Sequence, residues 1–350
     1  MKASIFFLVL FLLGIALLLE GCSLPYLAHV SRGQIQIINR RQKIEEAIQK
    51  GKVSDAQKKK LELVLEVRTY AIEKLKLKAS ENYTKYVDLK RDSVAYNLVV
   101  CPKDSLNPYT WWFPFVGRVA YLGFFDKEYA LKTKKEFEED GYDTYLRGVS
   151  AYSTLGWFDD PVFSTMLSFR DETLANVIIH ELTHGTIYRK GDTPFNEGVA
   201  TFVGNKGALE FLKEKYGAHS QPYQSALEAQ ADDLLFSAFI SEQRKKLDAY
   251  YGSSQSWVGD PSEEKVLKRE GEFLKIKKNF QKLKLSFKTS SYLYFDRLPL
   301  NNAIFVAFGQ YYEDLSLFEK VWEKHNYDLL KTIDFFKQRT SDDEWDWKDR

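Results

Sequence analysis

Residues 180–184 read His-Glu-Leu-Thr-His, so two of the five histidines in this chain are four positions apart. Only a helix brings side chains at this spacing onto one face, where both imidazoles can bind one metal ion. Ser168 with Asp171 is expected to form a capping box at the start of this helix, and Gly191 to end it. Its predicted apolar stripe consists of Leu174, Val177, Ile178 and Leu182. The chain is therefore constrained to fold around a helix that presents two imidazoles on one side.

A second helix is predicted just downstream, where residues 191–200 read GDTPFNEGVA. Thr193 is a suitable N-cap and Pro194 a suitable first-turn residue. Glu197 would then lie one turn into this helix and face back toward the histidines. A tetrahedral zinc ion with two imidazoles needs one more protein ligand and a water. Asp192 is an alternative third ligand, but Glu197 has a helix to hold it rigid. The predicted Zn²⁺ ligands are His180, His184 and Glu197. The alternative reading is two core histidines and a capping glutamate.

The N-terminus has the pattern of an export signal. Lys2 is followed by an apolar run over residues 5–19, which is shorter than the roughly 20 residues of a membrane-spanning helix. Leu19, Gly21 and Cys22 resemble a bacterial lipobox, in which the cysteine receives a diacylglycerol and becomes the mature N-terminus. We therefore predict a lipoprotein signal peptide over residues 1–21 and a lipid anchor on Cys22. The alternative is an ordinary signal peptide or a short membrane anchor.

Composition supports a globular body without a nucleic-acid partner. The chain has 350 residues, 44% of them hydrophobic, and 50 basic against 49 acidic residues give a net charge of +1. Its two cysteines cannot form a disulfide framework, and Cys101 is expected to be a buried apolar residue. The predicted fold is a mainly helical α+β domain over residues 22–350, with a small sheet in the first half packed on a zincin-like helical region.

The hydrophobic pattern divides this domain into four stretches. They are a helical stretch at 34–90, a strand-rich stretch at 93–163, the zinc helices at 169–215 and a helical stretch at 223–340. Short strands are expected at 98–100, 119–122 and 144–149. Residues 265–288 hold nine basic residues against two glutamates. We expect a solvated helix there, and the alternative is a basic face on anionic lipid. Its apolar side, expected to pack on the body, is Leu267, Leu274, Phe280 and Leu283.

Two resemblances to known families rest on longer segments. FNEGVA after HELTH is similar to the NEGFA-type segment of the aminopeptidase N family and, more broadly, of gluzincin metallopeptidases. Nearly the whole mature chain resembles a bacterial lipoprotein family of predicted aminopeptidases. The segments that carry this second resemblance are GCSLPY, SRGQI, WWFPFVGRVAYLGFF, VSAYSTLGWFDDPV, HELTH, FNEGVATFVG and LNNAIF. In gluzincins the glutamate after the asparagine is the third zinc ligand, which corresponds to Glu197.

The predicted chemistry is hydrolysis of a peptide bond. Glu181 adjoins a ligand but is poorly placed to be one, so we expect it to act as the general base. Gluzincins stabilise the oxyanion with a Tyr or His, for which Tyr152 and Tyr311 are candidates. Both could equally be aromatic packing residues. By analogy with aminopeptidase N, residues 151–154 could pair with an extended peptide. The glutamate that binds the α-amine in that family is missing from this segment. Asp159 or Asp160 could replace it.

These observations predict a zinc aminopeptidase that acts on peptides outside the cytoplasm. It would be held by its lipid at the bacterial cell envelope, facing the periplasm or the exterior, with the outer membrane favoured. Two alternatives remain open: a zinc endopeptidase with the same chemistry, and a non-catalytic envelope lipoprotein whose zinc is structural.

Overall fold

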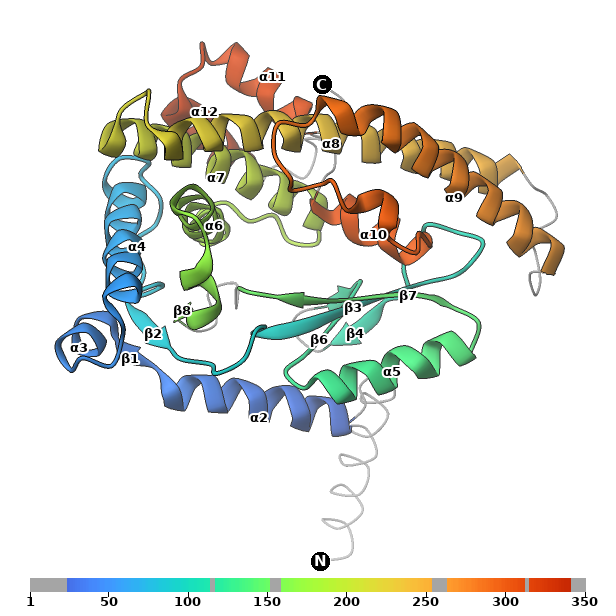
Figure 1. Cartoon of the computed structure of the whole chain (residues 1–350), viewed down its shortest axis with the longest axis horizontal. Helices are drawn as coiled ribbons and strands as arrows, with labels where there is room; N and C mark the ends of the chain where they lie inside the picture. Colours follow the sequence, from blue (N-terminus) through green and yellow to red (C-terminus); the bar gives the residue numbers. More distant parts are fainter. Residues whose placement is uncertain (1–23, 114–116, 152–158, 254–262, 312–314, 341–350) are drawn as a thin grey trace, which may run out of the picture.

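The computed structural model describes residues 24–113, 117–151, 159–253, 263–311 and 315–340 (Figure 1). Cys22 and the predicted signal peptide lie outside the described residues. The fold is α+β and mainly helical, with small sheets in the first half, as predicted. Among the described residues, no helix combines the length and the apolar character needed to cross a membrane.

The first 90 residues are less helical than the sequence indicates. Helices end at Glu73, and residues 85–87 form a strand, so the expectation of helix up to residue 90 is wrong. Lys76 and Tyr83 both adopt positive φ, which a helix cannot continue through. The elements here are α2 (Leu24–Arg40), β1 (Gln42–Lys43), α3 (Ile44–Gln49), α4 (Asp55–Glu73) and β2 (Lys85–Val87). β2 lies between β1, which is antiparallel to it, and the parallel strand β8 (Val162–Phe163).

A second sheet has the strand order β6–β3–β7 and is antiparallel throughout. Its strands are β3 (Ala95–Cys101), β6 (Leu122–Phe124) and β7 (Asp143–Val149), and a separate hairpin is formed by β4 (Trp111–Phe113) and β5 (Gly117–Val119). The strands expected at 98–100 and 144–149 are present. The one expected at 119–122 is wrong, because the chain bends there between two different strands.

Helix α5 (Lys127–Glu139) interrupts the stretch expected to be strand-rich. Asp126 caps its first turn by accepting a hydrogen bond from the Tyr129 N–H. Lysines and glutamates four residues apart pair along its surface, as in Lys135 with Glu139. This helix covers one face of the β6–β3–β7 sheet, and α10 (Asn302–Tyr311) covers the other (Figure 1).

Strand alternation explains the two covered faces. Leu98 and Val100 pack in the cluster between the sheet and α5, whereas Val99 and Cys101 pack against α10. Cys101 is fully buried and unpaired with another cysteine, as predicted. The remaining helices stack above the sheet (Figure 1). They are α6 (Asp171–His184), α7 (Thr193–Tyr216), α8 (Gln221–Ser253), α9 (Glu263–Leu283), α11 (Ser316–Lys324) and α12 (Leu329–Arg339).

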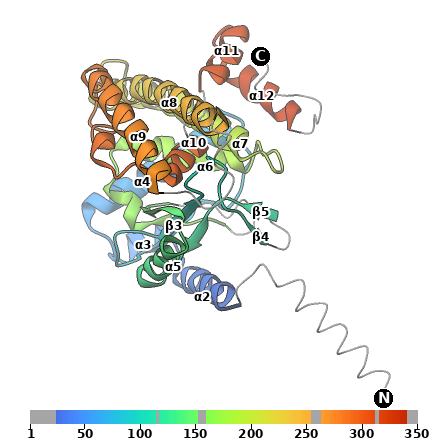
Figure 2. The same ribbon diagram turned by 90° about the vertical axis from the view of Figure 1, so that its right-hand side faces the viewer.

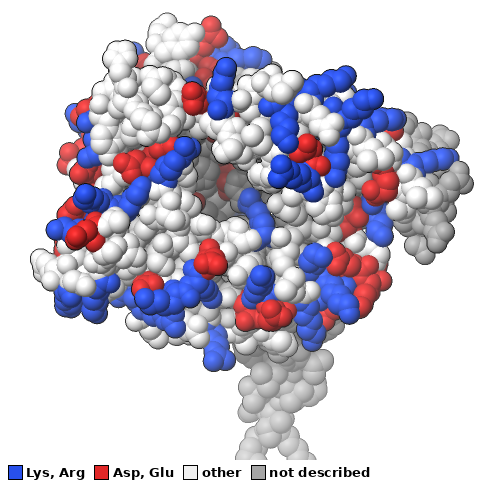
Figure 3. Space-filling view, viewed as in Figure 1, with Lys and Arg blue, Asp and Glu red and all other residues white. Residues whose placement is uncertain are grey.

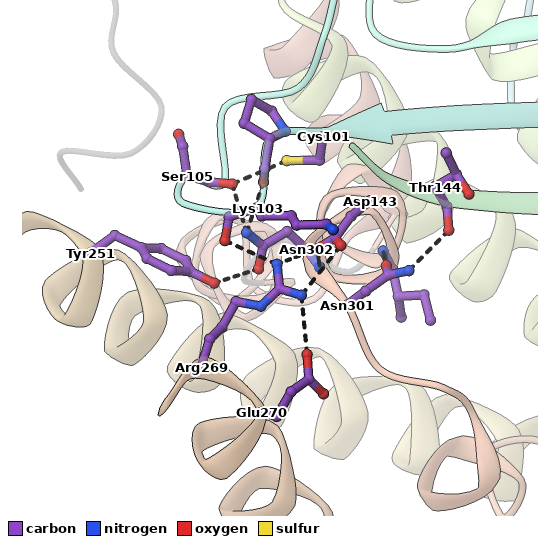
Figure 4. Close-up of polar contacts among 12 residues, drawn as sticks. Cys101, Lys103, Ser105, Asp143, Thr144, Tyr251, Arg269, Glu270, Asn301 and Asn302 are labelled. Atoms are coloured by element: carbon purple, nitrogen blue, oxygen red, sulfur yellow. Dashed lines mark hydrogen bonds and ion pairs between the residues drawn. The ribbon is translucent and has the colours of Figure 1, made fainter. Parts of the chain in front are cut away.

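A buried polar network joins the sheet to α9 and α10 (Figure 4). Arg269 of α9 donates to Asp143 at 2.8 Å, and the side chains of the pair are only 4% and 6% exposed. The backbone N–H of Asn302 donates to the same carboxylate at 2.9 Å, and Tyr251 donates to the Asn302 side chain at 2.6 Å. Asn302 of the LNNAIF segment therefore links α10 to β7 through Asp143 and to α8 through Tyr251.

Helix α9 packs differently from the expected pattern. Phe280 is buried and Leu283 packs beside it, as predicted. Leu267 and Leu274 are 71% and 67% exposed, so the expectation that they pack on the body is wrong. The face that packs is instead defined by Phe273 and the residues one turn on either side of it, Arg269 and Ile276.

Candidate metal centre

Helix α6 carries the two histidines on the spacing that the sequence requires. It begins at Asp171 without a side-chain cap, because the Ser168 hydroxyl donates to the Thr165 carbonyl instead. The expected capping box is therefore wrong. The helix also ends earlier than expected, at His184 with Gly185 as its C-cap. Gly191 lies in the following loop, where its φ of +81° suits a glycine.

The loop between the two ligand helices is closed by Asn196. Its side chain accepts from the Arg189 N–H at 2.7 Å and donates to the Arg189 carbonyl at 2.7 Å. Asp192 is the N-cap of α7 and accepts from the Phe195 N–H at 3.1 Å, so Thr193 is the first helical residue rather than the cap. These contacts fix where α7 begins and hence where Glu197 lies.

Three side chains converge between α6 and α7. The Nε2 atoms of His180 and His184 are 3.2 Å apart. Glu197 places Oε2 at 3.5 Å from the first and Oε1 at 3.7 Å from the second. Ligand atoms in a tetrahedral site with bonds of about 2.0–2.1 Å are separated by about 3.3–3.4 Å. The spacing of this donor set therefore suits one small cation.

Within the described part of the chain, these three residues form one group able to hold a metal ion. Asp192, the alternative third ligand, is not a member of it, since its carboxylate caps α7 and lies 3.8 Å from Arg189. The side chains are 15%, 5% and 20% exposed for His180, His184 and Glu197. The donors are thus largely shielded, with Glu197 retaining the most access to solvent.

Helix packing sets the separation of the ligands. Gly204 lies where α7 passes α6, and a Cβ there would come within 3.1 Å of the Asn176 carbonyl and of the His180 Cβ. At the next residue of α7, Asn205 accepts a hydrogen bond from the Asn176 side chain across the same interface at 2.6 Å. The two helices are held closely enough for Glu197 to reach both imidazoles.

The surroundings shift the pKa values of the three donor side chains in different directions. Burial and the neighbouring His180 lower the pKa of His184 to about 4, which keeps its imidazole neutral. Burial acts to lower the pKa of His180 as well, but its hydrogen bond with Glu197 raises it overall. Burial acts to raise the pKa of Glu197, and the two histidines outweigh it, so the pKa is lowered. Neutral imidazole and ionised carboxylate are the protonation states that a metal ion requires.

Glu181, the predicted general base, has a different environment. Burial raises its pKa to about 7, with the charges of Glu197 and Asp160 acting in the same direction and His180 opposing them. A carboxyl group whose pKa lies near neutrality can both accept and return a proton. Its position beside the ligands and its pKa suit the role predicted for it.

A residue that the sequence did not single out lies close to Glu181. Tyr83 is fully buried at a φ of +61°, and its hydroxyl has no hydrogen-bond partner among the residues that the structure describes. Burial, followed by the charges of Glu181 and Asp160, raises its pKa well above the ordinary value. Its N–H donates to the Asp160 carbonyl at 2.7 Å. Strained backbone and an unsatisfied buried hydroxyl are typical of functional sites. No sequence motif marks either feature.

The other predicted site residues are placed only in part. Tyr152 lies outside the described residues, as do positions 153 and 154 of the expected substrate strand. Tyr311 is the last residue of α10, and its side chain lies outside the described part. Asp159 pairs with Lys85 at 3.0 Å, whereas Asp160 is buried near Glu181. Of the two, Asp160 is therefore brought to the site.

The surface is hollowed beside these helices. Figure 3 shows a hollow near the middle of one face, above the sheet and between α6 and α10, with acidic and basic side chains in its walls. From the sheet side, the charge of Arg147 on β7 contributes to lowering the pKa of Glu197. A molecule that entered between the sheet and α6 would thus meet both the group of His180, His184 and Glu197 and a cationic side chain.

A family model described as "Putative aminopeptidase" matches residues 25–344. None of the curated proteins and none of the solved structures matches the chain.

Proposed function

Because this chain belongs to the putative aminopeptidase family, we propose that it hydrolyses peptide bonds at a zinc ion held by His180, His184 and Glu197. The observation that carries the proposal is the convergence of two Nε2 atoms and one carboxylate within 4.8 Å of one another. Three protein ligands leave a position open, as in catalytic rather than structural zinc sites. This argues against a closed, purely structural zinc.

The donor set fits zinc by its chemistry. Two imidazoles and one carboxylate on adjacent helices form a His₂Glu set, which is typical of metallopeptidases. When bound, zinc would act as a Lewis acid on the scissile carbonyl and lower the pKa of a neighbouring water toward about 7.

The chain's own residues would then move the protons. Glu181 takes a proton from the attacking water and passes it to the leaving nitrogen, which its pKa of about 7 allows in both directions. Glu197, with its lowered pKa, stays ionised and remains a ligand throughout. Tyr152 and Tyr311 remain the candidates to stabilise the oxyanion.

We propose removal of N-terminal residues as the reaction, with Asp160 as the group that attracts the substrate's α-amine. Its side chain is a buried carboxylate whose charge acts on Glu181, as does that of Glu197, and the amine of a bound peptide would be cationic. An endopeptidase would have no need of such a group. N-acetylated peptides separate the two, since an aminopeptidase should refuse them and an endopeptidase should cleave them.

We also propose that the chain works outside the cytoplasm, anchored to the bacterial envelope by a lipid on Cys22. Support comes from the signal-like residues 1–21 and the lipobox-like residues before this cysteine. Mass spectrometry of the N-terminal peptide would show the diacylglycerol. An unmodified Cys22 in the mature chain would refute the anchor.

The metal content of the purified protein tests the centre directly. We expect near-stoichiometric zinc in the wild type and a large loss in Glu197→Ala. Asp192→Asn is the matched control, because it alters a carboxylate of the same loop that caps α7 and is not a ligand. Full zinc in Glu197→Ala would refute the ligand set. Stoichiometric zinc without cleavage of any member of a broad peptide library would favour a non-catalytic lipoprotein.

A further inference from the structure

The predicted lipid anchor, Cys22, is close in sequence to the first helix of the described structure, α2. Helix α2 starts at Leu24, two residues after Cys22. Two residues span at most about 7 Å whatever their conformation. A lipid on Cys22 would therefore hold the membrane surface against the first turn of α2, and Figures 1 and 2 show this end of α2 at the edge of the molecule.

Helix α2 has one face packed on the body. The Tyr26 hydroxyl donates to the Gly123 carbonyl at 3.0 Å, and His29 accepts from the Phe125 N–H at 3.0 Å. At Gly33, a Cβ would overlap the Phe125 ring. These residues recur at the helical period, so they lie on one side of α2, and that side packs against the sheet.

The outer face of α2 is exposed and carries no acidic residue. Along residues 24–40 the charged side chains are Arg32 and Arg40, and Asp and Glu are absent. Ile35 is 56% exposed, and the exposed residues of α2 are apolar, uncharged polar or basic: Pro25, Ala28, Ser31, Arg32, Ile35, Gln36, Asn39 and Arg40. A helix side with basic and uncharged polar residues, without acidic ones, and with an exposed isoleucine is suited to contact with anionic lipid headgroups.

The β4–β5 hairpin lies beside the same end of α2. Phe113 of β4 contacts Tyr26 with ring centroids 5.9 Å apart. Trp112 is paired across the hairpin with Arg118, and both side chains point outward on the exposed side of the two strands. Trp112 is 41% exposed. Tryptophan is enriched at membrane interfaces, and a neighbouring guanidinium can bind lipid phosphate.

We propose that the outer face of α2 and the Trp112–Arg118 pair form a surface that rests on the headgroups of an anionic phospholipid bilayer. The proposal rests on membrane attachment through residues 1–23 and is independent of the peptidase activity. Charge complementarity and the short reach from Cys22 both favour a bilayer over a protein partner.

This surface is distinct from the basic helix α9. Figures 1 and 2 place α2 and α9 on opposite sides of the sheet, so one flat membrane cannot contact both. Leu274 of α9 is 67% exposed and Ile35 of α2 is 56% exposed. The two residues are therefore matched probes of the two candidate faces.

The first test measures tryptophan quenching in the full chain bound to vesicles of phosphatidylethanolamine and phosphatidylglycerol with brominated acyl chains. We expect Trp112→Phe to lose about half of the quenched emission, since its ring would lie at the interface. Trp322→Phe, on α11, should lose none. Undiminished quenching in Trp112→Phe would overturn the proposal.

The second test uses a membrane-impermeant maleimide on Ile35→Cys and Leu274→Cys in the same vesicles and in detergent. Cys101 is fully buried and would not compete. We expect vesicles to slow labelling of Ile35→Cys about fivefold or more and to leave Leu274→Cys nearly unchanged. Protection of Leu274→Cys instead would place the membrane on α9 and overturn the proposal. Failure of the chain to float with vesicles would refute the anchor itself and the surface with it.

Discussion

The pKa values of two glutamates in one site are shifted in opposite directions by their surroundings. Glu197 accepts from His180 and is kept ionised, with its pKa lowered. Burial raises the pKa of Glu181 to about 7 although it neighbours the same histidine. Pairs of titratable groups whose environments push their pKa values apart are typical of sites that carry out acid–base chemistry. The difference between the two pKa shifts arises from burial and contacts, since both residues are glutamates.

Substitution of Glu181 by Gln should therefore separate binding from catalysis. We expect full zinc content and a loss of peptide turnover by about 10²–10⁴-fold, the usual contribution of a general base. In the wild type, kcat/KM should rise with pH on an acid limb, because the base must lose its proton to act. A Glu181→Gln variant that keeps wild-type turnover would remove Glu181 from the mechanism.

At the residue scale, the sequence predicts the grouping of His180, His184 and Glu197 better than it predicts the residues around them. The HELTH spacing and Glu197 were predictable, because a helix fixes which side chains share a face. Tyr83 was not, since it lies almost one hundred positions before Glu181 in a segment with no periodicity and reaches the site through tertiary packing. The N-cap of α7 is Asp192 rather than the predicted Thr193. A shift of one residue at a helix end is rarely resolved by a sequence pattern alone.

Among the elements, local helices were predicted more reliably than long-range contacts. The α6–α7 pair follows from periodicity and turn residues, whereas α5 was missed among aromatic strands. The missed signal was its run of lysines and glutamates four residues apart. The buried face of α9 was misassigned because Arg269, a charged residue, is inside and Leu267 is outside. Asp143, which explains that arrangement, lies 126 residues earlier.

The Asp143–Arg269 pair offers a prediction at the scale of packed elements. Arg269→Met should leave the carboxylate buried beside Asn302 without its cation and destabilise the fold by about 3–5 kcal/mol. The double variant Asp143→Asn, Arg269→Met should recover much of that loss, since both charges are gone. Lys275→Met is the control on the same helix, because Lys275 is 70% exposed. Urea unfolding measures all three, and equal stability of Arg269→Met and Lys275→Met would contradict this account.

For the whole molecule, metal binding should couple to global stability. All three ligands sit on α6 and α7, which pack into the main hydrophobic cluster, so a metal bound there stabilises the folded state alone. Free zinc at 100 times its Kd should add about 2.7 kcal/mol to the free energy of unfolding. Scanning calorimetry with zinc and with a chelator measures this as a rise in Tm. Glu197→Ala should show no zinc-dependent rise, and a rise equal to wild type would refute the site.

The network in Figure 4 also makes folding depend on how much of the chain has been made. Asp143 can be buried at low cost only when Arg269 and the N–H of Asn302 are available, 126 and 159 residues later. A product that stops before residue 302 retains the sheet sequence and the complete HELTH segment, yet leaves this carboxylate without one of its partners. We expect such fragments to be cleaved readily by proteases even though they contain all three predicted metal ligands. We therefore expect closure of the sheet to depend on synthesis of the chain through residue 302.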